Sequence, residues 1–362
     1  MARKRWTLPR SEIYRKPIFY HCISRVVDRR RAFLADDKEK FRMFMRMYEK
    51  FTGCRAVSYC LMCNHIHLLI EVQPMPVNGF TDEELLKRLS AIYNEAVVAD
   101  VAKELHEARK NGTAEEIARQ VLEIHQRYTY RMHDLSRFME GLLQRFTRWF
   151  NRAHKRTGNL WEDAFKSVIV ENGVAAKTIS AYIDLNPVRA GMVKDPAEYR
   201  WSSYGEAIGG GSKGDGKKAR AGLVRAMRAH LGNTADASFW ENDVSREYRK
   251  ILMEGAIEQA KESINREGKS AVKVTRKGIS KAEAEHQAVS NDGDISLGKM
   301  LRCRVRYFTD GAVIGSRDFV NEVFKNSRER FGPKRKNGAR KLKGNAAPAA
   351  KILWSLRDLR TH

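Results

Sequence analysis

The chain of 362 residues carries 68 Lys and Arg against 44 Asp and Glu, a formal net charge of +24. This excess is larger than solubility requires and predicts a polyanionic partner, with nucleic acid as the first candidate. No apolar run approaches the ~20 residues of a membrane span, and the amino-terminal segment lacks the apolar core of a signal peptide. The five cysteines are odd in number and lie mostly in strand-like runs, which fits reduced thiols in a cytosolic compartment. We therefore expect a soluble cytoplasmic protein, associated with the nucleoid if its partner is DNA, with no membrane partner.

The first part of the chain predicts a β-α-β-β unit followed by a helical insertion. The expected segments are a strand at 16–27, a helix at 35–51, and strands at 54–62 and 65–72. Two heavily charged helices come next, each opened by a capping box, from Thr81 to about Lys110 and from Thr113 to about Arg131. We interpret residues 80–132 as an inserted helical hairpin.

An amphipathic helix and a strand-helix pair complete this part. From Asp134 to Gly158 the apolar residues follow one helical stripe. A strand is expected at 164–170, and the helix after it must end near Asn186, because the residue before a proline resists helical geometry. The order β-α-β-β-insertion-α-β-α matches the split βαβ, or ferredoxin-like, pattern. The prediction is an α+β fold, with a first domain at 1–207.

Beyond this domain the composition changes. Residues 208–220 are rich in glycine and charge and predict a linker. Residues 221–362 predict a mainly helical, basic extension with helices at about 221–231 and 238–265. The segment "DGAVIGSRDFV" indicates a turn, a short strand and the start of a helix. We expect the extension to bind DNA or to mediate assembly.

The stretch "CLMCNHIHLLIEV", residues 60–72, places two histidines in a strand-like run. Side chains alternate across a strand, so His65 and His67 share one face while their apolar neighbours face the other way. One reading is purely structural. A second is a zinc knuckle that adds Cys60 and Cys63, although no second ligand pair follows along the chain. The third is half of a catalytic metal site.

A tyrosine and an asparagine on the last helix of the domain favour the catalytic reading. Tyr182 and Asn186 are four residues apart and share a helix face. An amide oxygen would complete a His-His-Asn site for Mg²⁺ or Mn²⁺. The tyrosine one turn away would then be placed to attack a polarised phosphodiester. Taken alone, the two helix residues would more simply be a packing residue and a helix end.

Four segments, in order, carry a family resemblance: "NHIHLLIE", "RFTRWFNRAHKRTGNLWEDAFKS", "AYIDLNPVRAGMV" and "PAEYRWSSY". The first 205 or so residues resemble the single-tyrosine HUH transposases, and specifically the REP-associated tyrosine transposases. The resemblance implies that His65, Ile66 and His67 fill the HUH motif, that Asn186 is the third metal ligand, and that Tyr182 is the nucleophile. It implies cleavage and rejoining of single-stranded DNA through a 5′-phosphotyrosine intermediate. The insertion and the extension lie outside the compact family core.

The resemblance leaves two alternatives and several partners open. One alternative is a catalytically idle DNA-binding regulator, and the other is an HUH nickase of the replication or conjugation type. The expected partner is single-stranded DNA, with hairpin-forming repeats as one form, and the sequence does not decide between a monomer and a homodimer. The basic residues expected to contact DNA are Arg145, Arg148, Arg152, Lys155, Arg189, Lys334, Arg335 and Lys336.

Overall fold

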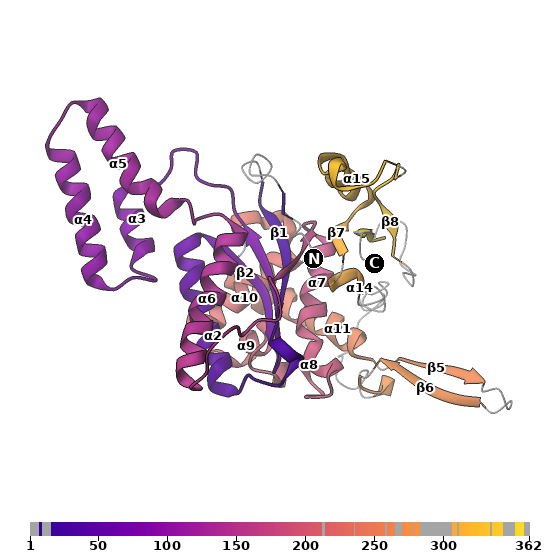
Figure 1. Ribbon diagram of the computed structural model, residues 1–362. Helices are drawn as coiled ribbons and strands as arrows, with labels where there is room; N and C mark the ends of the chain where they lie inside the picture. The colour runs from indigo at the N-terminus through magenta and orange to yellow at the C-terminus, as the bar shows by residue number, and fades with distance from the viewer. Residues whose placement is uncertain are drawn as a thin grey trace.

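The structure, a computed structural model, is a mixed α+β protein built around one large sheet (Figure 1). It describes residues 7–8, 16–211, 214–234, 236–257, 259–264, 270–276, 278–282, 306–309, 311–333, 335–342 and 352–357. No helix within these residues has both the length and the apolar character needed to cross a membrane.

The first four strands of the sheet have the predicted split βαβ topology. Strands β1 (Ile18–Arg25), β2 (Cys54–Leu61), β3 (His65–Val72) and β4 (Lys166–Val170) lie in the order β2-β3-β1-β4. Each neighbouring pair among these four is antiparallel. Helix α2 (Ala35–Thr52) connects β1 to β2, and helix α6 (Leu135–Ala153) precedes β4. The predicted fold class is confirmed.

Helices cover both faces of the sheet and separate two hydrophobic clusters. One face packs against α2, α6 and α15 (Arg317–Asn326), and the apolar stripe of α6 is buried there as predicted. The other face packs against α7 (Val174–Asp184), α9 (Ser203–Gly209), α10 (Gly214–Met227) and α11 (Ser245–Ala256). Strand alternation sends Ile66 and Leu68 to the first cluster and Leu69 to the second. The histidine face of β3 therefore looks toward α7.

The inserted helices project away from the sheet (Figure 1). Three helices occupy the segment: α3 (Asp82–Leu89), α4 (Glu95–Lys110) and α5 (Ala114–Thr129). The prediction of one helix from Thr81 to Lys110 was wrong, because the side chain of Asn94 accepts a hydrogen bond from Val97 N–H and caps a new helix there. The three helices share a small apolar cluster that also includes Phe51 of α2.

The chain beyond residue 207 is more closely integrated with the sheet than the sequence indicated. Helix α10 begins at Gly214, inside the expected linker, and packs so closely on β2 that a Cβ at Gly222 would lie 2.5 Å from the carbonyl oxygen of Val57. Within the expected linker itself, a Cβ at Gly216 would lie 2.4 Å from the carbonyl oxygen of Gly210, so glycine serves close packing there too. The expected helix at 238–265 ends at Ala256, and β5 (Gln259–Ile264) pairs with β6 (Ser270–Arg276) in a hairpin.

Three further strands extend the central sheet. Strand β7 (Gly311–Gly315) lies parallel to β4, and β9 (Trp354–Arg357) and β8 (Arg340–Lys341) follow outward. The short strand and helix start predicted from "DGAVIGSRDFV" correspond to β7 and α15. A short helix, α14 (Arg306–Thr309), precedes β7 and reaches the face of the sheet that carries the histidines. The extension therefore contributes residues close to the candidate site.

Candidate active site

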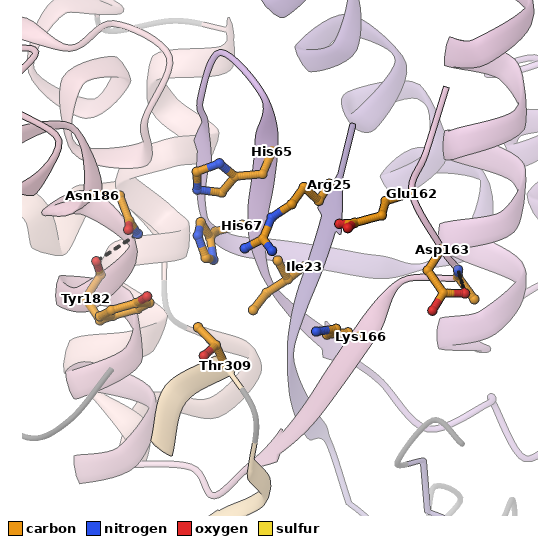
Figure 2. Close-up of a pocket in the computed structure, with 11 residues that line it drawn as sticks. Ile23, Arg25, His65, His67, Glu162, Asp163, Lys166, Tyr182, Asn186 and Thr309 are labelled. Atoms are coloured by element: carbon orange, nitrogen blue, oxygen red, sulfur yellow. Dashed lines mark hydrogen bonds between the residues drawn. The ribbon is translucent and has the colours of Figure 1, made fainter. Parts of the chain in front are cut away.

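The four residues singled out from the sequence line one cavity of about 380 Å³ (Figure 2). His65 and His67 come from β3, Tyr182 from the last turn of α7, and Asn186 from the first position of α8 (Asn186–Arg189). The remaining lining residues belong to β1, to β4 and the segment before it, and to the extension: Ile23, Arg25, Glu162, Asp163, Ala164, Lys166 and Thr309. Residues more than a hundred positions apart thus meet around one space.

The tyrosine lies against the histidine pair and is held from several sides. The ring centroids of His65 and His67 are 5.0 Å apart, and those of His67 and Tyr182 are 5.8 Å apart. Tyr182 is only 3% exposed, and its hydroxyl points into the cavity (Figure 2). The ring of Phe308 packs at 4.9 Å from the tyrosine ring, and the guanidinium of Arg189 lies 5.1 Å from its centroid. This packing restricts where the phenol can move.

Both cavity histidines are neutral at ordinary pH. Burial lowers the pKa of His65 to about 4, and the nearby charge of Arg25 acts in the same direction. Burial also lowers the pKa of His67 well below its usual value, helped by the neighbouring histidines His65 and His21 and by nearby arginines. A neutral imidazole has a lone pair on one ring nitrogen, which is the form that binds metals.

The amide of Asn64 decides which nitrogen of His65 has that lone pair. Asn64 Nδ2 donates to the carbonyl of Arg29, so its Oδ1 is the atom that faces His65 Nδ1 at 2.6 Å. An amide oxygen only accepts, so Nδ1 of His65 must carry the proton. The Nε2 atom of His65 is left with its lone pair on the ring edge opposite Asn64.

Asn186 is oriented by its own helix. Its Nδ2 donates to the carbonyl oxygens of Tyr182 and Ile183, at 3.1 and 3.2 Å. Carbonyls only accept, so the amide nitrogen must face them and the oxygen Oδ1 is directed away from the helix backbone. A hard oxygen donor is therefore presented beside two imidazoles, as Figure 2 shows.

These donors fit a small divalent cation and do not fit a zinc knuckle. Two imidazole nitrogens and one amide oxygen are a mixed N/O set of the kind that suits Mn²⁺ or Mg²⁺. In the described part of the chain, no group of three or more His, Cys, Asp and Glu side chains is placed to hold a metal. The thiol of Cys60 is buried against Met62, and that of Cys63 contacts Lys38. The Cys60-Cys63-His65-His67 alternative is therefore not supported.

Sequence reasoning missed one histidine. His21 of β1 is fully buried directly behind His67, with the two rings stacked at 5.2 Å between centroids. Residues diagonal to each other across paired strands come within reach of long side chains, and the register here pairs Ile23 with His67. In the sequence His21 looks like a lone strand histidine, and only the pairing of β1 with β3 reveals it.

Some of the basic residues expected to contact DNA are exposed, and others are engaged in contacts within the protein. Arg148, Arg152 and Lys155 are exposed along and just beyond the carboxyl-terminal half of α6, and Lys336 is exposed on the extension. Arg145 donates to the carbonyl of Ile92.

Two of the other positions are more enclosed and one is not described. Arg189 lies over the Tyr182 ring but does not line the cavity. Arg335 stacks on Phe331 and donates to the carbonyls of Asn337 and Gly338. Lys334 lies outside the described residues. Sequence alone did not separate exposed cations from those engaged in packing.

Part of the chain matches a known protein family. Residues 15–111 match the family model of the IS200-like transposases. The IS200-like match includes His65 and His67 and ends at residue 111, within the insertion. Tyr182 and Asn186 follow the insertion and lie outside the match. The resemblance predicted from the sequence is confirmed over this part of the chain.

One solved structure that resembles the chain is described as "Structure of the REP associates tyrosine transposase bound to a REP hairpin". The likeness has a TM-score of 0.32 and 14% sequence identity, and it covers 57% of this chain and 86% of the other. The comparison with curated proteins found no match.

Proposed function

We propose that this chain is a metal-dependent transposase that cleaves and rejoins single-stranded DNA through a 5′-phosphotyrosine at Tyr182. His65, His67 and Asn186 would hold Mg²⁺ or Mn²⁺. The observation that carries the proposal is the meeting of these four residues in one cavity, in a chain whose residues 15–111 match the IS200-like transposase family model.

The chemistry follows from the groups around the cavity. When bound, the cation would polarise a phosphoryl oxygen of the scissile phosphate. The phenolic oxygen of Tyr182 forms a bond to phosphorus and loses its proton, while the bond to the 3′ oxygen breaks and that oxygen takes up a proton. The products are a 5′-phosphotyrosine and a free 3′-OH, and the reverse attack by a 3′-OH rejoins the strand. The Arg189 guanidinium over the ring favours the phenolate that develops.

Positive charge near the cavity suits a phosphate backbone. Arg25 and Lys166 line the cavity itself, and Arg148, Arg152 and Lys155 are exposed on and just beyond α6. The partner we propose is single-stranded DNA, including strands that fold into hairpins. Because Tyr182 faces the histidine pair of its own chain, we propose that one chain forms a complete site.

Incubation with a labelled single-stranded oligonucleotide library and Mn²⁺, followed by denaturing gels, tests the proposal. We expect a covalent adduct and a shortened strand that disappear in excess EDTA and in Tyr182→Phe. Tyr199→Phe is the matched control, because Tyr199 is also a buried tyrosine but its hydroxyl donates to the carbonyl of Leu61. That variant should still cleave.

The outcomes separate the alternatives. DNA binding without any cleavage by the wild-type protein would favour an idle regulator and contradict the proposal. Cleavage without rejoining would favour a nickase. Cleavage that persists in Tyr182→Phe and is lost in Tyr199→Phe would move the nucleophile to the second tyrosine.

A further inference from the structure

Behind the proposed metal site, a chain of three groups runs from the extension to His67. The backbone carbonyl of Phe308 lies 2.8 Å from His21 Nδ1, and His21 Nε2 lies 3.0 Å from His67 Nδ1. His21 and Phe308 are 0% exposed, and His67 is 3% exposed. These three hydrogen-bonded groups are therefore shielded from water.

The direction of each hydrogen bond in this chain follows from the chemistry of its first member. A carbonyl only accepts, so the proton of the first bond must be on His21 Nδ1. A second proton on Nε2 would make His21 an imidazolium in a buried position, which carries a large desolvation cost. His21 Nε2 is therefore an acceptor, and the proton of the second bond belongs to His67 Nδ1.

We propose that His21 is a positioning residue that fixes the Nδ1-protonated tautomer of His67 and thereby presents the Nε2 lone pair of His67 to the cation. The inference rests on the proposed function, because it concerns how the proposed ligand is prepared. Metal-ligating histidines commonly donate their second ring nitrogen to such an outer partner, which fixes the ring and its tautomer. Asn64 does the same for His65. The two ligands would then be prepared in matching tautomers by different groups.

The inference also gives the extension a chemical role. Phe308 lies 287 positions from His21 in the sequence, and its carbonyl is the fixed acceptor that orients the whole chain of groups. Its ring packs on Tyr182 from the same short helix, α14. One segment of the extension thus contacts both the nucleophile and the partner of a metal ligand.

Two substitutions at His21 separate a positioning role from a packing role. His21→Leu places an apolar side chain of similar size at this position but leaves His67 Nδ1 without its acceptor. His21→Gln can donate through its amide nitrogen to Phe308 and accept through its amide oxygen from His67. We expect the leucine variant to bind Mn²⁺ about 10–100-fold more weakly, as is typical when an outer partner of a metal ligand is lost, and the glutamine variant to recover most of the affinity. Cys22→Ala, which alters the opposite face of β1, is the control and should bind Mn²⁺ like the wild type.

The decisive readout does not depend on activity. Nitrogen–proton correlation spectra of the full-length, metal-free protein labelled at histidine distinguish a protonated ring nitrogen from a bare one. The wild-type spectrum should show His67 protonated at Nδ1, and His21→Leu should lose this preference. Titration with Mn²⁺ by calorimetry then gives the affinities of the four proteins.

Each possible result tests a distinct claim. A His67 proton on Nε2 in the wild type, or unchanged Mn²⁺ affinity in His21→Leu, would overturn the positioning role. If the leucine variant fails to fold, the wild-type tautomer and the glutamine variant still decide the question. A Mn²⁺ affinity of His21→Gln as weak as that of a protein lacking His67 would also count against the positioning role. Failure of the wild-type protein to bind either Mn²⁺ or Mg²⁺ would refute the proposed function, while the tautomer spectrum would still test the geometry.

Discussion

The strand that carries the histidine pair is tied to helix α10 by a buried ion pair, and breaking it should destabilise the protein severely. Glu71 of β3 is 0% exposed, and Nε and Nη2 of Arg225 both lie 2.8 Å from its Oε1. Arg225 is itself 2% exposed. Arg225→Met retains a long apolar side chain that can still pack on Phe19, but it leaves the carboxylate buried without its main partner.

The size of the effect follows from the burial of the charge that remains. Removing one partner of a buried ion pair typically costs about 3–5 kcal/mol, much of it from the uncompensated charge. Arg55 lies 3.8 Å from the other carboxylate oxygen and is partly exposed, so it offsets little. The double substitution Glu71→Leu with Arg225→Met removes both charges and should lie within about 2 kcal/mol of the wild type, since buried pairs are often replaced by apolar residues at little cost.

Urea unfolding followed by circular dichroism measures both effects. Arg228→Met, one residue past the end of α10, is the control, because the ion pair of Arg228 with Glu247 is partly exposed and should contribute about 1 kcal/mol or less. A loss below about 1 kcal/mol in Arg225→Met, or a double variant as unstable as the single one, would refute this reasoning. Either result would mean that α10 is not coupled to β3 through this pair.

Three further predictions concern pH, DNA and metal. Burial raises the pKa of Asp184 to about 7, so its carboxyl is protonated in the folded chain and ionised in the unfolded chain between pH 4 and 7. Its stabilising contribution is complete below pH 4 and is lost as the pH rises to 7, at about 1.4 kcal/mol per pH unit, and urea unfolding at pH 5, 6 and 7 should show that Asp184→Asn removes this slope. Replacing Arg148, Arg152 and Lys155 together by alanine should flatten the log–log salt dependence of single-stranded DNA binding by about 0.7 per lost phosphate contact, and an unchanged slope would exclude them from the interface. His67→Ala should weaken Mn²⁺ binding, measured by calorimetry, by more than the factor of about 10–100 expected for loss of an outer partner. Mn²⁺ affinity equal to that of the wild type would exclude His67 as a ligand.

The parts of the fold that local pattern determines were predicted well. The two-residue alternation of β3 and the apolar stripe of α6 are set by short-range periodicity, and both appear as expected. The order of the first four strands followed from the sequence of elements, because a split βαβ unit allows few arrangements.

The parts that depend on distant partners were missed. Strands β8 and β9 are short, and nothing local distinguishes them, because β9 acquires its pairing from β7 and β8 acquires its pairing from β9. His21 becomes part of the candidate site through the register of β1 against β3 and through Phe308, neither of which the local sequence contains. The linker prediction rested on glycine content, whereas α10 begins inside that segment at Gly214, and a Cβ at Gly216 would lie 2.4 Å from the carbonyl oxygen of Gly210.

The most direct test of the account is to map the covalent product. The full-length protein is incubated with Mn²⁺ and a cleavable single-stranded oligonucleotide, digested with a protease and a nuclease, and analysed by mass spectrometry. The account predicts a nucleotide linked through its 5′ phosphate to the peptide that contains Tyr182. A linkage to any other residue, or cleavage with no protein-linked nucleotide at all, would contradict it.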